Sequence, residues 1–346
     1  MSRRLRAAVR DFAFRHVGGT ALVLIYHRVA DLERDPQLLA VGTAHFAEQM
    51  AMLAGTYRVV PLAELVTDLR KRHVPDRAVV VTFDDGYADN LLHAAPVLQR
   101  DGVPATVFVN SGYVGSGEEY WADEIEDIAL SPGPLPREIR LRVSAEDIVA
   151  TLDDCESYSE DDAIRDRGWN VLEPDSSARQ RLYRELCGFL EPLPSTDRAE
   201  ALRQLRDQAG TTGQVRSSHR RLTAAEVGEL DALDGIDVGA HTLNHHLLAA
   251  RSAEEQRTEV FSDRNALEKM CGRPISMLSY PYGGPDAYTE ATVGLVREAG
   301  FVGACANHPG VVKPWTDPYR IPRVLVRDWS AEYLARTIED WFDDPR

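Results

Sequence analysis

Short apolar segments typical of β-strands alternate with amphipathic helical segments along most of this 346-residue chain. The strand-like segments are 22–26, 58–61, 79–83, 105–109, 236–240, 276–280, 302–305 and 323–326. The helix-like segments, in which apolar residues recur about every 3.6 positions, are 44–53, 62–70, 91–100, 224–233, 253–270 and 288–299. This alternation predicts an α/β fold with a parallel sheet, and about eight strands favour a barrel. An open, doubly wound sheet is the alternative.

Residues 113–218 interrupt the alternation. Pro132, Pro134 and Pro136 break the chain there, and most of the acidic excess falls in the same region. The pattern predicts an acidic, mostly helical insertion with helices near 120–130, 178–190 and 197–208 and loops near 131–144 and 155–177. Because the insertion follows a strand of the predicted barrel, we expect it on the face where the carboxyl ends of the strands, and active sites, gather. It is placed either to cap a substrate or to bind a partner.

The chain therefore divides into a basic N-terminal segment at 1–19, a barrel formed by 20–112 and 219–346, and the insertion at 113–218. Within residues 1–16, five arginines alternate with apolar residues. Such a segment is typical either of an amphipathic helix on an anionic membrane surface or of a basic helix packed on its own domain.

Charge and cysteine content exclude several classes of protein. The formal net charge of −16 argues against a general nucleic-acid-binding protein, which would present a basic face. The four cysteines are scattered without a Cys-x-x-Cys motif, as expected of reduced thiols. No apolar run approaches the roughly 18 residues that span a bilayer, and the N-terminus lacks the pattern of a secretory signal. We therefore expect a cytoplasmic protein, with peripheral membrane contact through residues 1–16 as an option.

Two adjacent carboxylates, Asp84 and Asp85, stand at the end of the apolar strand segment 79–83. A buried strand has no structural use for two charges at its tip, since an unpaired buried carboxylate costs several kcal/mol. Gly86 allows a sharp turn, so that both carboxylates can face one centre. A polar turn with Asp85 as the N-cap of the next helix is the plainer alternative.

Histidines follow two other strand segments. His241 and His245 come directly after 236–240, and two histidines four residues apart can meet one metal ion. Together with one carboxylate they would make a two-histidine, one-carboxylate site with open positions. His27 follows the first strand segment, where a lone histidine is more often structural.

The stretch Thr-Phe-Asp-Asp-Gly at 82–86 together with His-Thr-x-x-His at 241–245 resembles the NodB-type polysaccharide deacetylases, carbohydrate esterase family 4. The resemblance spans about 20–112 and 219–330. It implies a distorted (β/α)7 barrel and a divalent metal, most often zinc, with cobalt, nickel, manganese or iron as alternatives. It does not cover the helical insertion, which we expect on the C-terminal face of the barrel strands.

The resemblance also implies roles for individual residues. Asp84 matches the catalytic base of the family, and Asp85, His241 and His245 match its metal ligands. The catalytic-acid histidine of the family usually lies near the C-terminus, where this chain has no good match. His27, in Tyr-His, instead resembles the acid of the circularly permuted branch that includes poly-N-acetylglucosamine deacetylases.

Two departures from the family pattern leave the residue that orients the base open. The third motif lacks its arginine before Pro-Tyr, and the fourth retains only Asp328 and Trp329, with Leu325 at the position of its first aspartate. Arg323 is a candidate to replace the missing arginine, and an ordinary surface arginine is the alternative. A backbone N–H near Tyr87 could hold the oxyanion.

Three aromatic residues, Tyr87, Tyr282 and Trp329, are candidates for an apolar wall that contacts the sugar ring or the acetyl methyl group. Tyr120 and Trp121 could extend this wall from the insertion. Core packing is the alternative for each of the three.

The expected activity is metal-dependent removal of the N-acetyl group from an amino-sugar unit in a polysaccharide or a glycan biosynthetic intermediate, with N-acetylated carbohydrate as the partner. Three alternatives stand beside it: a non-catalytic carbohydrate-binding relative, a metal amidohydrolase acting on a small-molecule amide, and an iron-dependent oxygenase, because two histidines and a carboxylate also suit ferrous iron.

Overall fold

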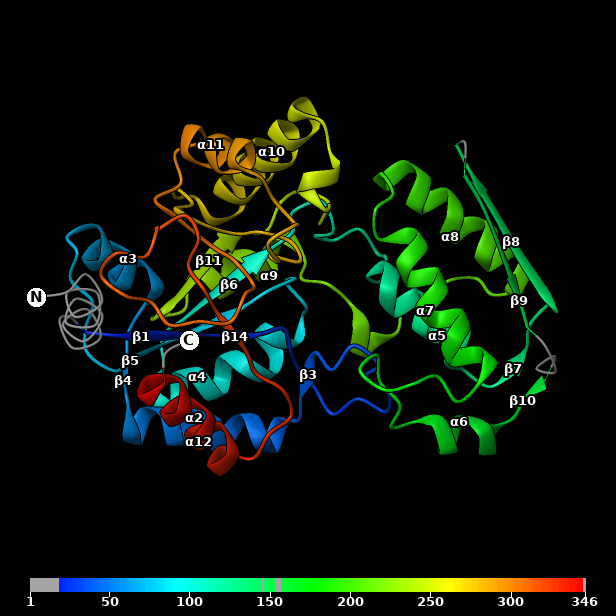
Figure 1. Cartoon of the computed structure of the whole chain (residues 1–346), viewed down its shortest axis with the longest axis horizontal. Helices are drawn as coiled ribbons and strands as arrows, with labels where there is room; N and C mark the ends of the chain where they lie inside the picture. Colours follow the sequence, from blue (N-terminus) through cyan, green and yellow to red (C-terminus); the bar gives the residue numbers. More distant parts are fainter. Residues whose placement is uncertain (1–18, 145, 153–156, 345–346) are drawn as a thin grey trace, which may run out of the picture.

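The computed structural model of this chain describes residues 19–144, 146–152 and 157–344. The basic segment predicted at 1–16 lies outside the described residues. Figure 1 shows two parts side by side: a larger part built on a parallel sheet, and a smaller, mostly helical part formed by the insertion.

All strands of the central sheet run parallel. Their order is β13 (Gly303–Cys305), β12 (Met277–Ser279), β11 (Ile236–Ala240), β6 (Ala105–Val109), β5 (Ala78–Phe83), β1 (Ala21–Tyr26) and β14 (Val324–Leu325), with β4 (Arg58–Val59) on β5. The sheet curls into a half-barrel whose end strands, β13 and β14, do not pair with each other. The prediction of a distorted (β/α)7 barrel is confirmed.

Two of the three strands that carry the proposed chemistry, β1 and β5, are buried along their whole length. Every residue of β1 and β5 is buried, as their unbroken apolar sequences predict for a sheet covered on both faces. The one polar side chain of β5, Thr82, donates its hydroxyl proton to the carbonyl of Leu24 at 2.7 Å. The burial fixes the carboxyl ends of these strands rigidly beneath the site.

Helices flank the sheet, and most of them lie where the sequence predicts. They are α2 (Thr43–Thr56), α3 (Leu62–Arg70), a π-helical turn (Asn90–Ala94) that leads into α4 (Ala95–Asp101), α9 (Ala224–Asp231), α10 (Ala253–Cys271), α11 (Glu290–Glu298) and α12 (Ala331–Asp343). Capping boxes at Thr223, Ser252 and Thr289 begin α9, α10 and α11. The terminal helix α12, which the sequence reasoning missed, packs against α2. None of the described helices combines the length and apolar character that a bilayer crossing requires.

The insertion has an apolar core of its own. Its helices are α5 (Trp121–Leu130), α6 (Glu160–Asp166), α7 (Ala178–Leu190) and α8 (Ser195–Ala209), and its antiparallel strand pairs are β8 (Glu138–Val143) with β9 (Glu146–Thr151) and β7 (Gly133–Pro134) with β10 (Ser157–Tyr158). The expected loops near 131–144 and 155–177 were therefore wrong in part. In β8, Ile139, Leu141 and Val143 are buried and alternate with exposed residues, which is the pattern of a half-buried strand.

Short elements complete the fold. β2 (Arg28–Val29) pairs in parallel with β3 (Ala40–Val41) beside the insertion, and single 3₁₀ turns occupy Ser217–His219 and Leu248–Ala250.

A glycine in β11 allows close packing of the sheet core. A Cβ at Gly239 would lie 2.5 Å from the ring of Phe108, its partner in the register with β6. Phe108 is fully buried, so its ring has no room to retreat. We predict that Gly239→Ala lowers the free energy of unfolding by about 1–3 kcal/mol, measured by denaturant unfolding.

Gly294→Ala in α11 is the matched control. A Cβ there meets no described atom within 4 Å, and alanine is favoured over glycine inside a helix by about 0.5–1 kcal/mol. Its stability should stay level or rise. Equal losses in the two variants would contradict the packing argument.

Candidate active site

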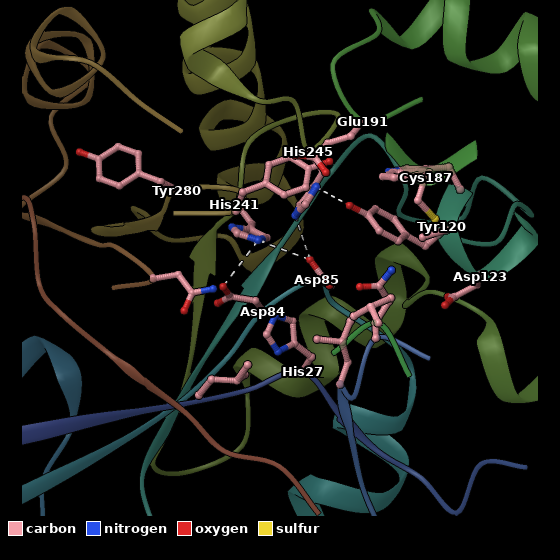
Figure 2. A pocket seen from close by; sticks show the side chains of 18 of the residues that line it. His27, Asp84, Asp85, Tyr120, Asp123, Cys187, Glu191, His241, His245 and Tyr280 are labelled. Atoms are coloured by element: carbon pink, nitrogen blue, oxygen red, sulfur yellow. Dashed lines mark hydrogen bonds and ion pairs between the residues drawn. The ribbon is translucent and has the colours of Figure 1, made fainter. Parts of the chain in front are cut away.

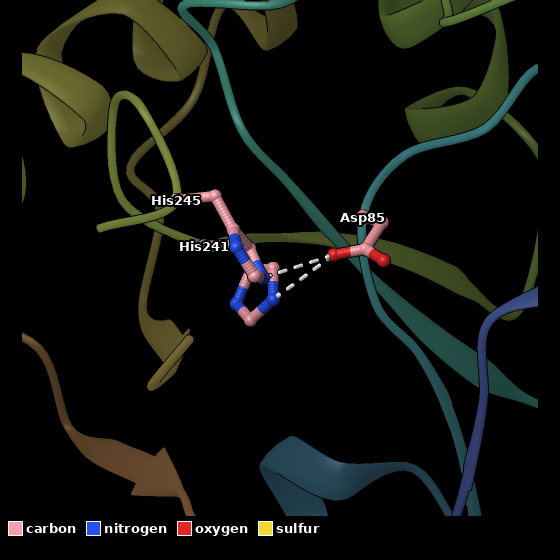
Figure 3. Close-up of side chains that lie close together, drawn as sticks. All are labelled: Asp85, His241 and His245. Atoms are coloured by element: carbon pink, nitrogen blue, oxygen red, sulfur yellow. Dashed lines mark ion pairs between the residues drawn. The ribbon is translucent and has the colours of Figure 1, made fainter. Parts of the chain in front are cut away.

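Three side chains from two strand ends converge on one point beside the sheet (Figure 3). Nε2 of His241 and Nε2 of His245 lie 3.4 and 3.3 Å from Oδ1 of Asp85. All three residues are buried, and their ligand atoms lie within 4.8 Å of one another. The structure thus brings together the three residues that the sequence suggests as metal ligands. Their role remains a prediction.

The donor set suits a divalent cation. Among the described residues, Oδ1 of Asp85 has no hydrogen-bond partner although it is buried, and a buried carboxylate oxygen without a donor is costly unless a cation faces it. Burial raises the pKa of Asp85, but His241 and His245 outweigh it and leave the pKa well below its usual range. Two imidazoles and one carboxylate are common ligands of zinc and related metals.

Hydrogen bonds on the far side of each imidazole aim its Nε2 at Asp85. Nδ1 of His241 contacts the carbonyl of Ser279 at 2.8 Å, so Nδ1 carries the proton and Nε2 has the free lone pair. Nδ1 of His245 pairs with the hydroxyl of Tyr120 (Figure 2). Burial lowers the pKa of His245 to about 4, although Asp85 acts to raise it. The lowered pKa keeps the ring of His245 neutral.

The second carboxylate, Asp84, is bound mainly by other residues, although its Oδ2 also lies 3.7 Å from Nε2 of His241. Nη1 and Nη2 of Arg323 donate to its two oxygens at 2.8 and 2.7 Å, and the hydroxyl of Ser279 donates to Oδ2 at 3.0 Å. Burial raises the pKa of Asp84, but Arg323 and His241 lower it below its usual range. Asp84 is therefore an ionised, fixed carboxylate beside the three proposed ligands.

Arg323 is fully engaged by the protein. It is 1% exposed, and besides Asp84 it donates to the carbonyl of Ala306 at 2.8 Å and to the Ser279 hydroxyl at 2.7 Å. It is not an ordinary surface arginine, and it does not line the cavity. Its N–H groups are taken by Asp84, Ser279, Thr82 and the carbonyl of Ala306, which leaves none for a substrate or an oxyanion. That Arg323 replaces the missing third-motif arginine stays a prediction.

His27 lines the cavity that also contains the two aspartates. It lies on one side of them, and His241 and His245 lie on the other (Figure 2). Its Nδ1 is buried and has no hydrogen-bond partner in the part of the chain that the structure describes. Burial lowers the pKa of His27, whereas Asp85 and Asp84 raise it, and the net direction is downward. An imidazole nitrogen without a protein partner is available to a substrate.

Backbone strain is concentrated at this site. Asp85, Thr242, His245 and Tyr282 have φ values of 76°, 63°, 53° and 60°. The left-handed region costs a non-glycine residue of order 1 kcal/mol or more, most of all a β-branched one such as Thr242. Such strain persists only where the surrounding structure holds it, and here it turns two proposed ligands toward one centre.

A cavity of about 360 Å³ lies between the half-barrel and the insertion (Figure 2). Its floor is formed by His27, Asp84, Asp85, His241 and His245. Tyr282 is in its wall, with its ring centroid 4.8 Å from that of His245. Tyr120 and Trp121 line it from the insertion, as expected.

Two of the predicted wall residues lie elsewhere. The hydroxyl of Tyr87 donates to Asp123 at 2.7 Å, and its ring lies between the guanidinium groups of Arg28 and Arg221, at 4.2 and 4.1 Å. The Trp329 ring packs on Tyr333, with centroids 5.1 Å apart. Neither residue lines the cavity, so the alternative of packing holds for both.

Several residues that shape the site carry no sequence signal. Tyr120 was expected only in a wall, yet it bonds His245 from 125 positions away. Asp263 of α10 accepts the backbone N–H of His241 at 3.0 Å and that of Ser111 at 2.8 Å. Arg221 donates to the carbonyl of Asp85. No local motif marks such contacts, because each depends on the tertiary fold.

Comparison with known proteins shows that part of the chain is similar to the polysaccharide deacetylases. The model of the family described as polysaccharide deacetylase matches residues 71–134 and 214–304, which include both ends of the insertion but not residues 135–213. A poly-β-1,6-N-acetyl-D-glucosamine N-deacetylase of Escherichia coli K12 is 33% identical over 90 residues, which are 24% of this chain and 13% of that protein. The chain spans well under half the length of the curated relatives it matches.

Solved structures share the fold. IcaB from Ammonifex degensii superposes with a TM-score of 0.57 at 20% identity, covering 93% of this chain and 98% of that one. The Streptococcus pyogenes deacetylase PplD, solved in complex with acetate, superposes with a TM-score of 0.54 at 15% identity. The match covers 93% of this chain and 99% of that one. These likenesses show that the chain has the fold of these deacetylases.

The geometry predicts how metal affinity responds to substitution. Asp85→Ala should abolish measurable binding of zinc or cobalt, because it removes the only carboxylate of the proposed ligand set. Tyr120→Phe should weaken binding about 10–100-fold, the usual cost of removing a hydrogen bond that orients a histidine ligand. Competition titration against a chromophoric chelator measures both.

Tyr113→Phe is the control. Tyr113 packs on the ring of Tyr120, and it affects His245 only through that ring. Its affinity should match that of the wild type. Undiminished affinity in Tyr120→Phe would show that this hydrogen bond does not orient the ligand.

Arg323→Met is predicted to cost about 3–5 kcal/mol, because it leaves the Asp84 carboxylate buried without its main partner. In the variant, burial raises the pKa of Asp84, so protonation now favours the folded state. The deficit should shrink as the pH falls towards 5, whereas in the wild type the stabilisation from Asp84 is lost at low pH.

Denaturant unfolding in the presence of a chelator provides the measurement. The control is Arg320→Met, whose salt bridge reaches Glu290, an 85% exposed side chain. It should change stability by less than about 1 kcal/mol. A deficit in Arg323→Met that is small or independent of pH would contradict the assignment.

Proposed function

We propose that this protein removes the N-acetyl group from an amino-sugar unit in a polysaccharide or a glycan biosynthetic intermediate. The observation that carries the proposal is the different environment of the adjacent aspartates: Asp85 faces both histidines at 3.3–3.4 Å, whereas both oxygens of Asp84 accept from Arg323 and its nearest histidine, His241, is 3.7 Å away. The family domain and the name of the Escherichia coli relative support an N-acetylated carbohydrate as the substrate.

Asp85, His241 and His245 would hold the metal, for which we propose zinc. When bound, such an ion would lower the pKa of water and polarise the amide carbonyl. Amide hydrolysis needs both effects at neutral pH. Cobalt, nickel, manganese and iron suit the same ligands.

Asp84 would accept the proton of the attacking water. Its hydrogen bonds to Arg323 and Ser279 keep the carboxylate ionised and fix its orientation. The proton must then reach the leaving nitrogen, because an amine anion is too poor a leaving group to depart alone.

His27 is placed to supply that proton from Nδ1, the buried atom that lacks a partner among the described residues. Its protonated form depends on Asp84 and Asp85, which oppose the effect of burial on its pKa. Tyr282, in the cavity wall beside His245, would contact the acetyl methyl group or the sugar ring.

Acetate release from a panel of N-acetylhexosamine substrates, measured with metal content, tests the proposal. Asp84→Asn should lower the rate by about 10²–10⁴-fold, the usual contribution of a general base, and should retain the metal. Asp237→Asn, at a 44% exposed aspartate of β11, is the control and should behave as the wild type.

A near-wild-type rate in Asp84→Asn would refute the base assignment. Binding of metal and sugar without acetate release would instead identify a non-catalytic carbohydrate-binding relative. Turnover confined to small-molecule amides would identify a different amidohydrolase.

A further inference from the structure

The cavity above the proposed metal ligands has two walls of different origin. One belongs to the half-barrel and includes Leu39, Asn307, Leu325 and Arg327. The other belongs to the insertion and is formed by Tyr120, Trp121, Ala122, Asp123, Val171, Cys187 and Glu191. The insertion is thus part of the substrate cavity, and the way it is attached to the half-barrel decides from which sides a substrate can enter.

On one side the cavity is closed by contacts with the segment 33–37 that precedes β3. The backbone N–H of Val171 donates to the carbonyl of Pro36 at 2.9 Å, and the amide of Gln37 donates to the hydroxyl of Tyr183 at 2.8 Å. Arg167 forms an ion pair with Glu33 on the same side. These bonds join the insertion to the half-barrel beside Gln37 and Val171, which both line the cavity.

On the other side the insertion is tied to the segment that follows the metal-ligand histidines. The hydroxyl of Ser195 contacts Nε2 of His246 at 2.6 Å, and Arg251 donates to the carbonyl of Pro192. In Figure 1 this contact, at the start of α8, and the contact near β3 lie at opposite edges of the junction between the two parts.

The chain itself closes the back of the cavity. The segments that leave and re-enter the half-barrel are joined by Arg216, which donates to Glu119 at 2.7 Å and also pairs with Glu126. Arg221 lies behind Tyr120, with its guanidinium 4.7 Å from the centre of that ring. The insertion is therefore joined to the half-barrel at three places around the cavity, and we expect these contacts to hinder a long polymer from lying across the site with both of its ends in solvent.

Polar groups in the insertion wall remain available to a ligand. Nε1 of Trp121 is buried, and none of the described residues accepts its hydrogen bond. Glu191, half-buried at the end of α7, presents its carboxylate to the same cavity. A buried indole N–H needs an acceptor, and a sugar hydroxyl can accept from Trp121 while another donates to Glu191.

We propose that this cavity takes the end of a glycan, either a single N-acetylated sugar or the terminal unit of a chain, and excludes internal units of a long polymer. The inference rests on the proposed function. A volume of about 360 Å³ lies near the lower end of ligand cavities, which span roughly 300–1,000 Å³, as expected for one or two sugar rings.

The test is acetate release from N-acetylglucosamine, from its oligomers of two to six units carrying a label at one end, and from the long polymer, with the deacetylated position mapped by mass spectrometry. We expect kcat/KM to be highest for one or two units and at least ten-fold lower for the polymer. The mapped products should be deacetylated at a terminal unit alone.

Glu191→Ala should raise KM about five- to ten-fold for the short substrates with little change in kcat, since Glu191 binds the sugar away from the reacting atoms. Glu185→Ala, at an exposed position on the same helix, is the matched control and should match the wild type. Equal KM values in the two variants would remove Glu191 from the sugar site.

Deacetylation at internal units, or kcat/KM that rises with chain length, would overturn the terminal-unit proposal while leaving the deacetylase function intact. Acetate release from none of these substrates would overturn both. The two failures are therefore distinguishable in one experiment.

Discussion

The buried ion pair between Arg323 and Asp84 is the interaction on which the site depends. Two aspartates adjacent in the chain would otherwise both be drawn to the same cation. Arg323 donates to both oxygens of Asp84 and is itself held by Ser279 and the carbonyl of Ala306. Because breaking such a pair leaves a buried charge, the arrangement is rigid. Asp85 remains free to face His241 and His245.

The insertion contributes to the chemistry as well as to the shape of the site. Through Tyr120 it orients one proposed ligand, and through Trp121 and Glu191 it lines the cavity. Its own apolar core and hairpin make it a stable wall rather than a loose loop. Residues 135–213 separate the two segments that match the polysaccharide deacetylase model, and the insertion to which they belong forms one wall of the cavity.

Much of the fold could be predicted from the sequence, because continuous apolar strands such as β5 and periodic helices such as α3 carry their pattern locally. The proposed ligands stood out because Asp85, His241 and His245 end such strands. Arg323 could only be a candidate, since its partner lies 239 positions away. The positions of Tyr87 and Trp329 were missed because an aromatic residue beside a motif looks the same whether it lines a cavity or packs in the core.

The most direct test of the central claim is a crystal structure of the cobalt-loaded protein, with the metal located by anomalous diffraction. We predict that the ion is bound by Oδ1 of Asp85 and by Nε2 of His241 and His245, and that Asp84 keeps both of its hydrogen bonds to Arg323. A metal ion coordinated by Asp84, or one bound away from these three residues, would contradict the account.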